Sequence, residues 1–454
     1  MDKKQTLLCG FVDQARDLIA AAEKTIWENP ELGFEEWKTH AYMKAEFEKM
    51  GYSVVEVGNI PGFYADLDTG KPGPKVVLMA EMDALLQPTH YAAVDGVAHA
   101  CGHHAQCAAL LGAAYALKQP GALEGLSGTV RLMAVPAEEL GGSNLERRYE
   151  MHRQGLIQFS QGKPELMARG LLDDADIAIM VHTTRGDTHD FRCDGGCNAI
   201  MYKYATFSGK AVHSAQIQKS VNALYAVNLA IAGINSIRET FPDDKCVRVN
   251  SRILDPSVGC TKMRVGINAV DEATQEQLSQ RIDQILLGAA VAMGTQLTIS
   301  NDPACAALLL PDKLAEVSKQ ACADLVGEDR VRFIPYWNRG GADLGDVSWV
   351  IPSIHLNACG AGASVHTDDF HVADLERACV NSAKAQVLIV ESLLQNNAQK
   401  GREVMDDFAP HAIPMKEYIA KKAARFTSKV TEFTDDGNSL AVTLKEDNKA
   451  RFLP

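Results

Sequence analysis

Residues 75–83, KVVLMAEMD, decide how this chain folds, because they form an apolar run that ends in acidic residues. An apolar run of this length without polar alternation is typical of a strand that is buried on both faces of a sheet. The same plan returns at residues 128–139, GTVRLMAVPAEE, where a second apolar run is followed by Glu138 and Glu139. The repetition indicates two strands of one buried sheet, each with carboxylates near its carboxyl end.

Two more segments continue this pattern. Residues 175–184, ADIAIMVHTT, end close to His182, and residues 348–360, SWVIPSIHLNACG, are followed by His366. Helical segments such as 105–118 separate the strands. Alternating strands and helices predict an α/β fold with a mostly parallel central sheet and helices on both faces. In such sheets ligands bind at the carboxyl ends of the strands, which is where these segments place their polar side chains.

Between residues 194 and 312 the sequence changes character. Segments that alternate apolar and polar residues, such as NAIMYKYATFSG, predict half-exposed strands, and residues 220–237 predict a helix. We therefore expect a small α+β domain, 194–312, inserted between two parts of a large domain, 1–193 and 313–400. We expect residues 401–454 to be a C-terminal extension with a basic helix and a terminal hairpin through DDGNS.

The composition argues against several classes of protein. The chain carries 45 basic and 58 acidic residues, a net charge of −13 at pH 7, so nucleic acid and anionic membranes are unfavourable partners. We expect neither a transmembrane helix nor a signal peptide, because the sequence has no apolar run of the required length. Eleven irregularly spaced cysteines are too few for a disulfide framework in 454 residues, and they fit a reducing cytoplasm.

The candidate site begins at residues 99–106, HACGHHAQ, just before a helix of small residues. A cysteine and a histidine one residue apart suit a borderline-soft ion such as Zn²⁺ or Mn²⁺, although the pair alone is a weak signal. Polar residues at other strand ends complete a set of five candidate metal ligands: Cys101, His103, Glu139, His182 and His366. Five ligands exceed one closed tetrahedral site and fit two ions that share a ligand. Glu138 is then left to act as general base and later as general acid.

These residues also have plainer interpretations. Cys101 could be a buried thiol that binds no metal, and Glu138 with Glu139 could be a solvated pair at a strand end. Cys193 and Cys197, in CDGGC, could form a metal or redox pair, although two thiols in a glycine-rich turn are a simpler explanation. The ordered set of partners along the chain favours the metal site.

Seven motifs together resemble one protein family: VVLMAEMDAL, HACGH, VPAEE, VHTT, SGKAVHSA, ADLGDVSWVIPSIH and VHTDDF. In this order they resemble the aminoacylase-type metallopeptidases of clan MH, family 20, especially the p-aminobenzoyl-glutamate hydrolase and indole-3-acetyl-amino-acid amidohydrolase branch. The resemblance implies a zinc-exopeptidase-like catalytic domain and an inserted lid domain that forms a homodimer. It supports the same five ligands and Glu138 as the base.

The resemblance also adds two residues and marks two differences. It implies that Asp83 orients a ligand histidine, and that His213 reaches the active site of the partner subunit to help stabilise the oxyanion. The residue after His103 is His104, where this group usually has Asp or Asn. The lid segment ILDPSVGCTKMRVGIN lacks the Gly-Gly, Asn-Val-Ile-Pro pattern, so no substrate-carboxylate residue can be transferred. Arg339, Lys203 and Arg264 are candidates for that role, although solvated surface positions are the simpler interpretation.

We therefore expect a cytoplasmic, homodimeric hydrolase with two divalent metal ions, Zn²⁺ or Mn²⁺. It would cleave the amide bond of a small N-acyl or N-aroyl amino acid and release the free amino acid. Two alternatives stay open. One is a dipeptidase that acts on unusual dipeptides, suggested by DLGDVSWVIPSIH, and the other is a non-catalytic metal-bearing binder, suggested by the altered lid segment. Glu138 argues against the binder, because a pure binder needs no base.

Overall fold

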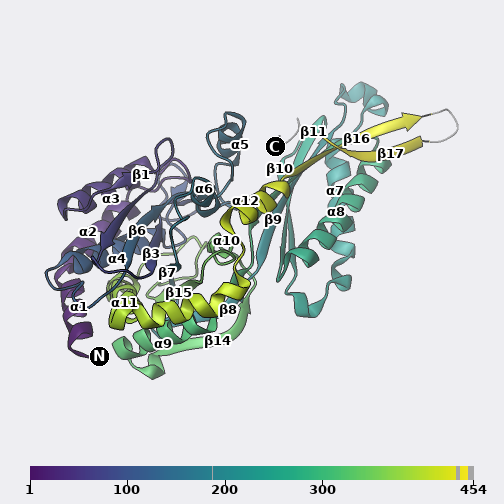
Figure 1. Cartoon of the computed structure of the whole chain (residues 1–454). Coiled ribbons are helices and arrows are strands. Elements are labelled where there is room, and N and C mark those ends of the chain that lie inside the picture. The colour runs from purple at the N-terminus through teal and green to yellow at the C-terminus, as the bar shows by residue number, and fades with distance from the viewer. Residues whose placement is uncertain (187, 436–439, 448–454) are drawn as a thin grey trace.

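Two sheets organise the chain, one in a large domain and one in a smaller domain beside it (Figure 1). The structure, a computed structural model, describes residues 1–186, 188–435 and 440–447. The N-terminal helices lie on the large domain, and the chain returns to the small domain near its C-terminal end (Figure 1).

The large sheet has the strand order β1-β2-β6-β3-β7-β15-β8-β13, with β14 paired to β8. Its strands are β1 (Val55–Glu56), β2 (Phe63–Asp68), β3 (Lys75–Glu81), β6 (Thr129–Val135), β7 (Ile177–Thr184), β8 (Phe191–Cys197), β13 (Leu308–Leu309), β14 (Val331–Asn338) and β15 (Ser353–Cys359). The four central strands β6, β3, β7 and β15 are parallel neighbours, so their carboxyl ends meet at one edge. This confirms the predicted α/β fold and the four strands that the sequence predicted for its central sheet. A separate two-stranded ladder joins β4 (Leu85–Leu86) and β5 (Val97–Ala98).

Both faces of the large sheet are covered, as the mostly apolar strands predict. Val76 and Leu78 of β3 belong to one core, while Val77 and Met79 belong to the core on the opposite face. The first core is closed by α1 (Lys3–Gln14), α2 (Arg16–Trp27), α3 (Trp37–Lys49), α4 (His103–Lys118), α9 (Asp312–Val326) and α11 (Asn381–Phe408). The second is closed by α6 (Gly162–Ala168), α10 (Leu344–Val347) and α12 (Met415–Ala424). The further helix α5 (Leu145–Arg153) follows the strand end of β6.

The small domain contains an antiparallel sheet in the order β10-β11-β9-β12-β16-β17. Its strands are β9 (Ala199–Ser208), β10 (Arg248–Asp255), β11 (Cys260–Ala269), β12 (Gln296–Cys305), β16 (Thr427–Asp435) and β17 (Leu440–Glu446). Helices α7 (Ala223–Ser236) and α8 (Glu272–Met293) pack on this sheet around a core of their own.

The C-terminal extension joins the small sheet, because β16 pairs with β12 and then with β17. Four residues of the predicted hairpin turn, 436–439, lie outside the described residues. The predicted boundary 193/194 falls within β8, and 400/401 falls within α11; the domain division stays a prediction.

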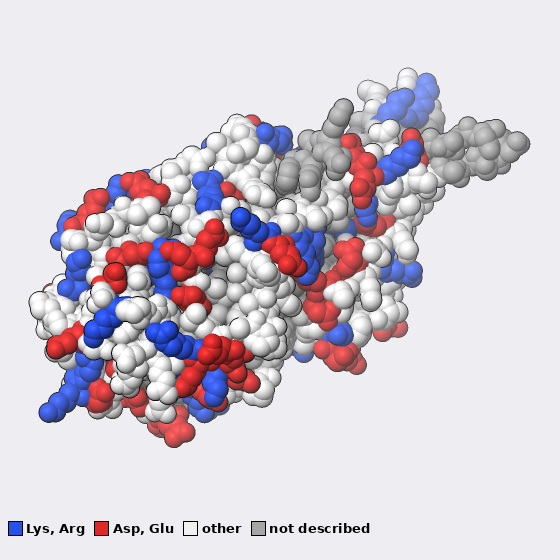
Figure 2. All heavy atoms as spheres, viewed as in Figure 1, with Lys and Arg blue, Asp and Glu red and all other residues white. Residues whose placement is uncertain are grey.

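The surface carries charges of both signs. Figure 2 shows acidic and basic side chains interspersed over both domains on the face that it presents. Such a mixture keeps the electrostatic field of this face weak, because neighbouring charges partly cancel. Among the helices of the described ranges, none is both long enough and apolar enough to cross a bilayer.

Candidate metal centre

The start of α4 brings Cys101 and His103 to the carboxyl edge of the large sheet. Gly102 between them has a φ of +99°, and a Cβ at this position would lie 3.2 Å from Phe370 and 3.3 Å from Thr183. Only glycine suits this left-handed, crowded position. The glycine therefore allows the tight turn that begins α4, with the thiol of Cys101 before it and the imidazole of His103 after it, as the sequence predicts.

The turn after β6 places Glu138 and Glu139. Ala137 has a φ of +56°, which is uncommon for a residue with a side chain, and contacts from elsewhere hold the turn in this conformation. The backbone N–H of Ala137 donates to the buried Glu36 carboxylate at 2.7 Å, and Gln161 donates to the carbonyl of Glu138 at 2.5 Å. These contacts fix the backbone of the turn from which the carboxylates of Glu138 and Glu139 project.

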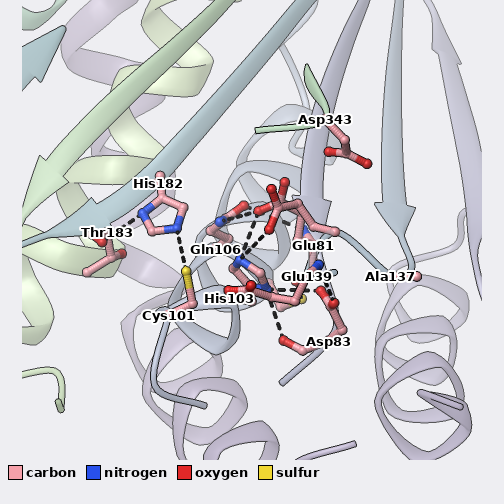
Figure 3. Close-up of polar contacts among 12 residues, drawn as sticks. Glu81, Asp83, Cys101, His103, Gln106, Ala137, Glu139, His182, Thr183 and Asp343 are labelled. Atoms are coloured by element: carbon pink, nitrogen blue, oxygen red, sulfur yellow. Dashed lines mark hydrogen bonds and ion pairs between the residues drawn. The ribbon is translucent and has the colours of Figure 1, made fainter. Parts of the chain in front are cut away.

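The five predicted ligands come together in two groups that share one residue. In the first group, Cys101, His103 and His182 have donor atoms within 4.8 Å of one another, and in the second group, Cys101, Glu139 and His366 do. Sγ of Cys101 lies 3.3 Å from Nε2 of His182, and Nε2 of His366 lies 2.9 Å from Oε1 of Glu139. The first of these contacts is drawn in Figure 3, with Cys101 and His182 facing each other.

Neighbouring acceptors orient the two histidines of the first group (Figure 3). Nδ1 of His103 lies 2.9 Å from the carbonyl oxygen and 3.0 Å from the carboxylate of Asp83, and Nδ1 of His182 donates to the Thr183 carbonyl at 2.8 Å. With the proton on Nδ1, the lone pair of each ring is on Nε2 and can bind a metal. Asp83 also accepts the backbone N–H of Glu139 at 2.8 Å through its other oxygen.

The donor set fits a pair of divalent ions. Nε2 of His103 and Oε1 of Glu139 are buried and lie against other polar side chains of the site, 3.1 Å from Oε2 of Glu81 and 2.9 Å from Nε2 of His366 respectively. Burial and Glu139 raise the pKa of Cys101, but the neighbouring imidazoles outweigh them and lower it from 9.0 to about 6. A thiolate, a carboxylate and three imidazoles are ligands that Zn²⁺ accepts.

Glu138 lies beside the two groups. Its carboxylate is 3.9 Å from Nε2 of His103, and its side chain keeps 12% of its surface exposed. Burial, followed by the negative charges of Glu81 and Glu139, raises the pKa of Glu138 well above its ordinary value. A carboxyl group in this position can exchange protons with a molecule in the site.

A buried ion-pair network behind Glu138 was not predicted from the sequence. Lys163, in the first turn of α6, contacts the carboxylates of Glu81 and Asp343, and all three side chains are almost completely buried. Gln106 donates to Glu81 at 2.8 Å, and Oε2 of Glu81 lies 3.1 Å from Nε2 of His103 (Figure 3). Glu81, His103 and Glu138 also form a third group with metal-ligand spacing, so Glu81 is part of the site.

Other predicted residues lie elsewhere or in different surroundings. His213 is exposed in the small domain, where its Nδ1 accepts the backbone N–H of Ala215 at 3.2 Å. The interpretation of Lys203 and Arg264 as solvated residues is wrong, because their relative exposures are 0% and 4%. Lys203 is ion-paired with Asp283, and Arg264 donates to the Gly141 carbonyl at 3.0 Å. The two side chains point to opposite faces of the small sheet, because Lys203 is opposite Val265 and Arg264 is opposite Tyr204 in the register. Lys203 lies on the face that α8 covers, and Arg264 lies on the face toward the large domain.

Comparison with known protein families gives a match to "Peptidase family M20/M25/M40" over residues 77–392. This range is more than half of the chain and contains all five candidate ligands and Glu138.

Three curated proteins illustrate the similarity. The IAA-amino acid hydrolase ILR1-like 6 of Arabidopsis thaliana is 28% identical over 73% of this chain and 69% of its own length. The Xaa-Arg dipeptidase of Homo sapiens is 26% identical over 79% of this chain and 80% of its own length. One subunit of the p-aminobenzoyl-glutamate hydrolase of Escherichia coli is 29% identical over 67% of this chain and 63% of its own length. In two further plant relatives, ILR1-like 5 and ILR1-like 4, the match spans 60% and 50% of the protein.

Solved structures share the fold. A protein described as an aminohydrolase from methicillin-resistant Staphylococcus aureus superposes with a TM-score of 0.67 at 19% identity, covering 86% of this chain and all of that one. A Bacillus subtilis protein described as a dinuclear metal-binding peptidase of the M20 family superposes with a TM-score of 0.60 at 19% identity, covering 83% of this chain and 98% of that one.

Proposed function

Because this chain belongs to peptidase family M20/M25/M40, we propose that it is a metal-dependent amidohydrolase acting on an N-acyl or N-aroyl amino acid. The products are the free amino acid and the acid of the acyl group. The observation that carries this proposal is the division of the five donor side chains into two groups that share Cys101. Two of the relatives bear names, IAA-amino acid hydrolase and p-aminobenzoyl-glutamate hydrolase, that describe an acyl group joined to an amino acid.

The two groups would hold two divalent ions. Cys101, His103 and His182 would bind the first ion, and Cys101, Glu139 and His366 the second, with the thiolate shared. When bound, such ions lower the pKa of a water molecule and polarise a carbonyl oxygen. Zn²⁺ suits the thiolate and imidazole donors, and Mn²⁺ is the alternative to be tested beside it.

Glu138 performs the proton transfers of the proposed reaction. Its carboxylate takes a proton from the attacking water and later delivers that proton to the leaving amide nitrogen. The side chain is close to both groups, yet it is not needed to complete either one. Asp83 acts through the ligands, since it orients His103 and accepts a hydrogen bond from Glu139.

The proposed enzyme is a homodimer in which His213 of one protomer reaches the partner's site and helps to stabilise the oxyanion. Strand β10 is at an open edge of the small sheet and exposes Ile253 and Leu254. Tyr225 and Leu229 on α7 are also exposed, at 59% and 44%. An open edge with apolar neighbours supports pairing with a second copy. Light scattering should give about twice the 49.2 kDa of one chain, and a value for one chain alone would contradict the dimer.

A cytoplasmic location is part of the proposal. All eleven cysteines have free thiols, and most of them are buried. Free thiols persist in a reducing compartment. Cell fractionation with a tagged full-length chain tests this location, and recovery from an oxidising compartment would contradict it.

The second candidate function is a dipeptidase. It is favoured by the human relative, named Xaa-Arg dipeptidase, whose match covers 80% of that protein. Both functions require the same site, because a peptide bond is also an amide. They differ in the group that supplies the carbonyl of the scissile bond. In a dipeptide this group is an amino acid with a free amine, whereas in an N-acyl or N-aroyl amino acid it carries no such amine.

The experiment offers the protein a mixture of N-acyl amino acids, aroyl-glutamates and dipeptides with added Zn²⁺ or Mn²⁺, and measures release of free amino acid. Release that a chelator abolishes is expected from the acyl substrates. Release from dipeptides alone would select the second function. No release by protein that holds two ions would contradict both functions and favour a binder.

A further inference from the structure

His366 is held differently from the other four candidate ligands. Its side chain is 50% exposed, whereas Cys101, His103 and Glu139 are buried at the sheet edge. It lies in a loop after β15, and its φ of +63° is uncommon for a residue with a side chain. Its backbone N–H donates to the Ala100 carbonyl at 2.7 Å. A ligand in an exposed loop and a strained conformation must be kept in place by contacts from outside the loop.

The segment 87–91, QPTHY, supplies these contacts; we refer to it as the clasp. The side chains of Gln87 and Thr89 both donate to one carboxylate oxygen of Asp368, each at 2.6 Å. The backbone N–H of Tyr91 donates to the carbonyl of the same residue at 3.1 Å. Three donors of the clasp therefore converge on the residue two positions after His366.

The fourth contact comes from His90. Its Nδ1 accepts the backbone N–H of Ala92 at 3.1 Å, so its Nε2 carries the proton and donates to the Phe370 carbonyl at 2.9 Å. Every residue of the clasp except the proline thus donates a hydrogen bond to the loop that carries His366.

The clasp is anchored to the part of the fold that holds the first group of ligands. His90 is 3% exposed, and its ring lies 5.6 Å from Trp27, centroid to centroid. Trp27 also lies 4.8 Å from the ring of His104, the neighbour of His103 at the start of α4. The clasp therefore connects an exposed loop, through Trp27, to the start of α4, which directly follows the shared candidate ligand Cys101.

We propose that the clasp positions His366 and thereby sets the metal affinity of the second group, without contacting the ion itself. This inference rests on the proposed two-metal function. The hydrogen bonds that the clasp donates to the loop end on Asp368 and Phe370, and none of them ends on a member of the first group. We therefore expect the first group to keep its affinity for its metal ion when these bonds are lost. Residues that orient metal ligands typically change affinity about 10–100-fold when they are replaced.

The test is a Zn²⁺ titration of the full-length double variant Gln87→Leu/Thr89→Val against a competing chelator, with elemental analysis after dialysis. The matched control is Gln399→Leu/Thr240→Val, which removes an exposed glutamine bond to Glu403 at 2.8 Å and an exposed threonine bond to Ile237 at 2.6 Å. The single variant Thr89→Ser keeps the hydroxyl and should retain wild-type affinity at both groups.

We expect two ions in the wild type and the control, and an affinity for the second ion lowered about 10–100-fold in the double variant. An unchanged first affinity shows that the double variant is folded. Two ions bound with wild-type affinities would overturn the inference and leave the proposed function intact, and equal loss of both ions would also overturn the inference. A wild type that binds fewer than two ions would contradict the proposed two-metal site itself.

Discussion

The carboxylate of Asp83 lies 3.0 Å from Nδ1 of His103, and both side chains are almost completely buried. The other oxygen of the same carboxylate accepts the backbone N–H of Glu139 at 2.8 Å. One acidic residue therefore orients a ligand of each group. Because this residue holds the ring and the turn in place, we expect its loss to disturb both of the proposed metal positions.

Replacement of Asp83 by alanine should lower the affinity of both ions by about 10–100-fold, because the ring of His103 and the backbone of Glu139 lose the same partner. The measurement is Zn²⁺ binding by competition with a chelator. Asp68→Ala, at an exposed end of β2, is the control and should bind as the wild type does. An unchanged affinity in Asp83→Ala would show that the orientation contributes nothing to binding.

Glu138→Gln should reduce kcat by about 10²–10⁴-fold while the metal content stays at the wild-type value. The amide keeps the size of the side chain but cannot take a proton from water. Amino acid release and elemental analysis on the same preparation separate the two effects. If activity persists at the wild-type rate, another group is the base.

Three variants test the sharing of Cys101. Cys101→Ser should remove both ions, because Cys101 belongs to both groups. The serine hydroxyl that replaces the thiol stays protonated at pH 7 and is therefore a poor metal ligand. His182→Ala and His366→Ala should each remove one ion, since each histidine belongs to one group. Metal-to-protein ratios after dialysis give the answer. A serine variant with two ions would remove Cys101 from the ligand set.

Lys163→Met should destabilise the fold by about 3–5 kcal/mol, because it leaves the Glu81 and Asp343 carboxylates buried without their cation. Denaturant unfolding measures the change. Lys24→Met, which breaks an exposed contact to Glu28 at 3.9 Å, is the control and should change stability by less than about 1 kcal/mol. Similar stabilities for the two variants would mean that the buried network is energetically neutral.

Stability should fall as the pH is lowered from 7 to 4, in part because of His152. Burial lowers the pKa of this histidine from 6.5 to about 4, so the unfolded chain binds the proton first as the pH falls. The resulting destabilisation is small above pH 6.5 and reaches about 3 kcal/mol at pH 4. Denaturant unfolding at several pH values should show a shallower pH dependence for His152→Gln than for the wild type. Parallel curves would exclude His152 as a contributor.

The sequence by itself determined the α/β fold and the composition of the candidate site. Each central strand is mostly apolar, and three candidate ligands, Glu139, His182 and His366, lie near or after the end of such a strand. Cys101 and His103 stand just before a helix of small residues, so both patterns are local and can be recognised. Cys101, His103, Glu139, His182 and His366 were therefore predicted together, and the structure places all five within two overlapping groups.

Only the tertiary structure decided what holds these ligands. Lys163 contacts Glu81 across 82 residues of sequence, and Gln87 contacts Asp368 across 281. A lysine in a short helix and a glutamine in a loop have no periodicity that indicates a buried ion pair or a clasp. Their partners follow from the packing of distant segments at the sheet edge. The candidate ligands could be predicted because buried strands and helices leave a local pattern in the sequence. The residues that hold them in place could not be predicted, because contacts between segments far apart in the sequence leave no such pattern.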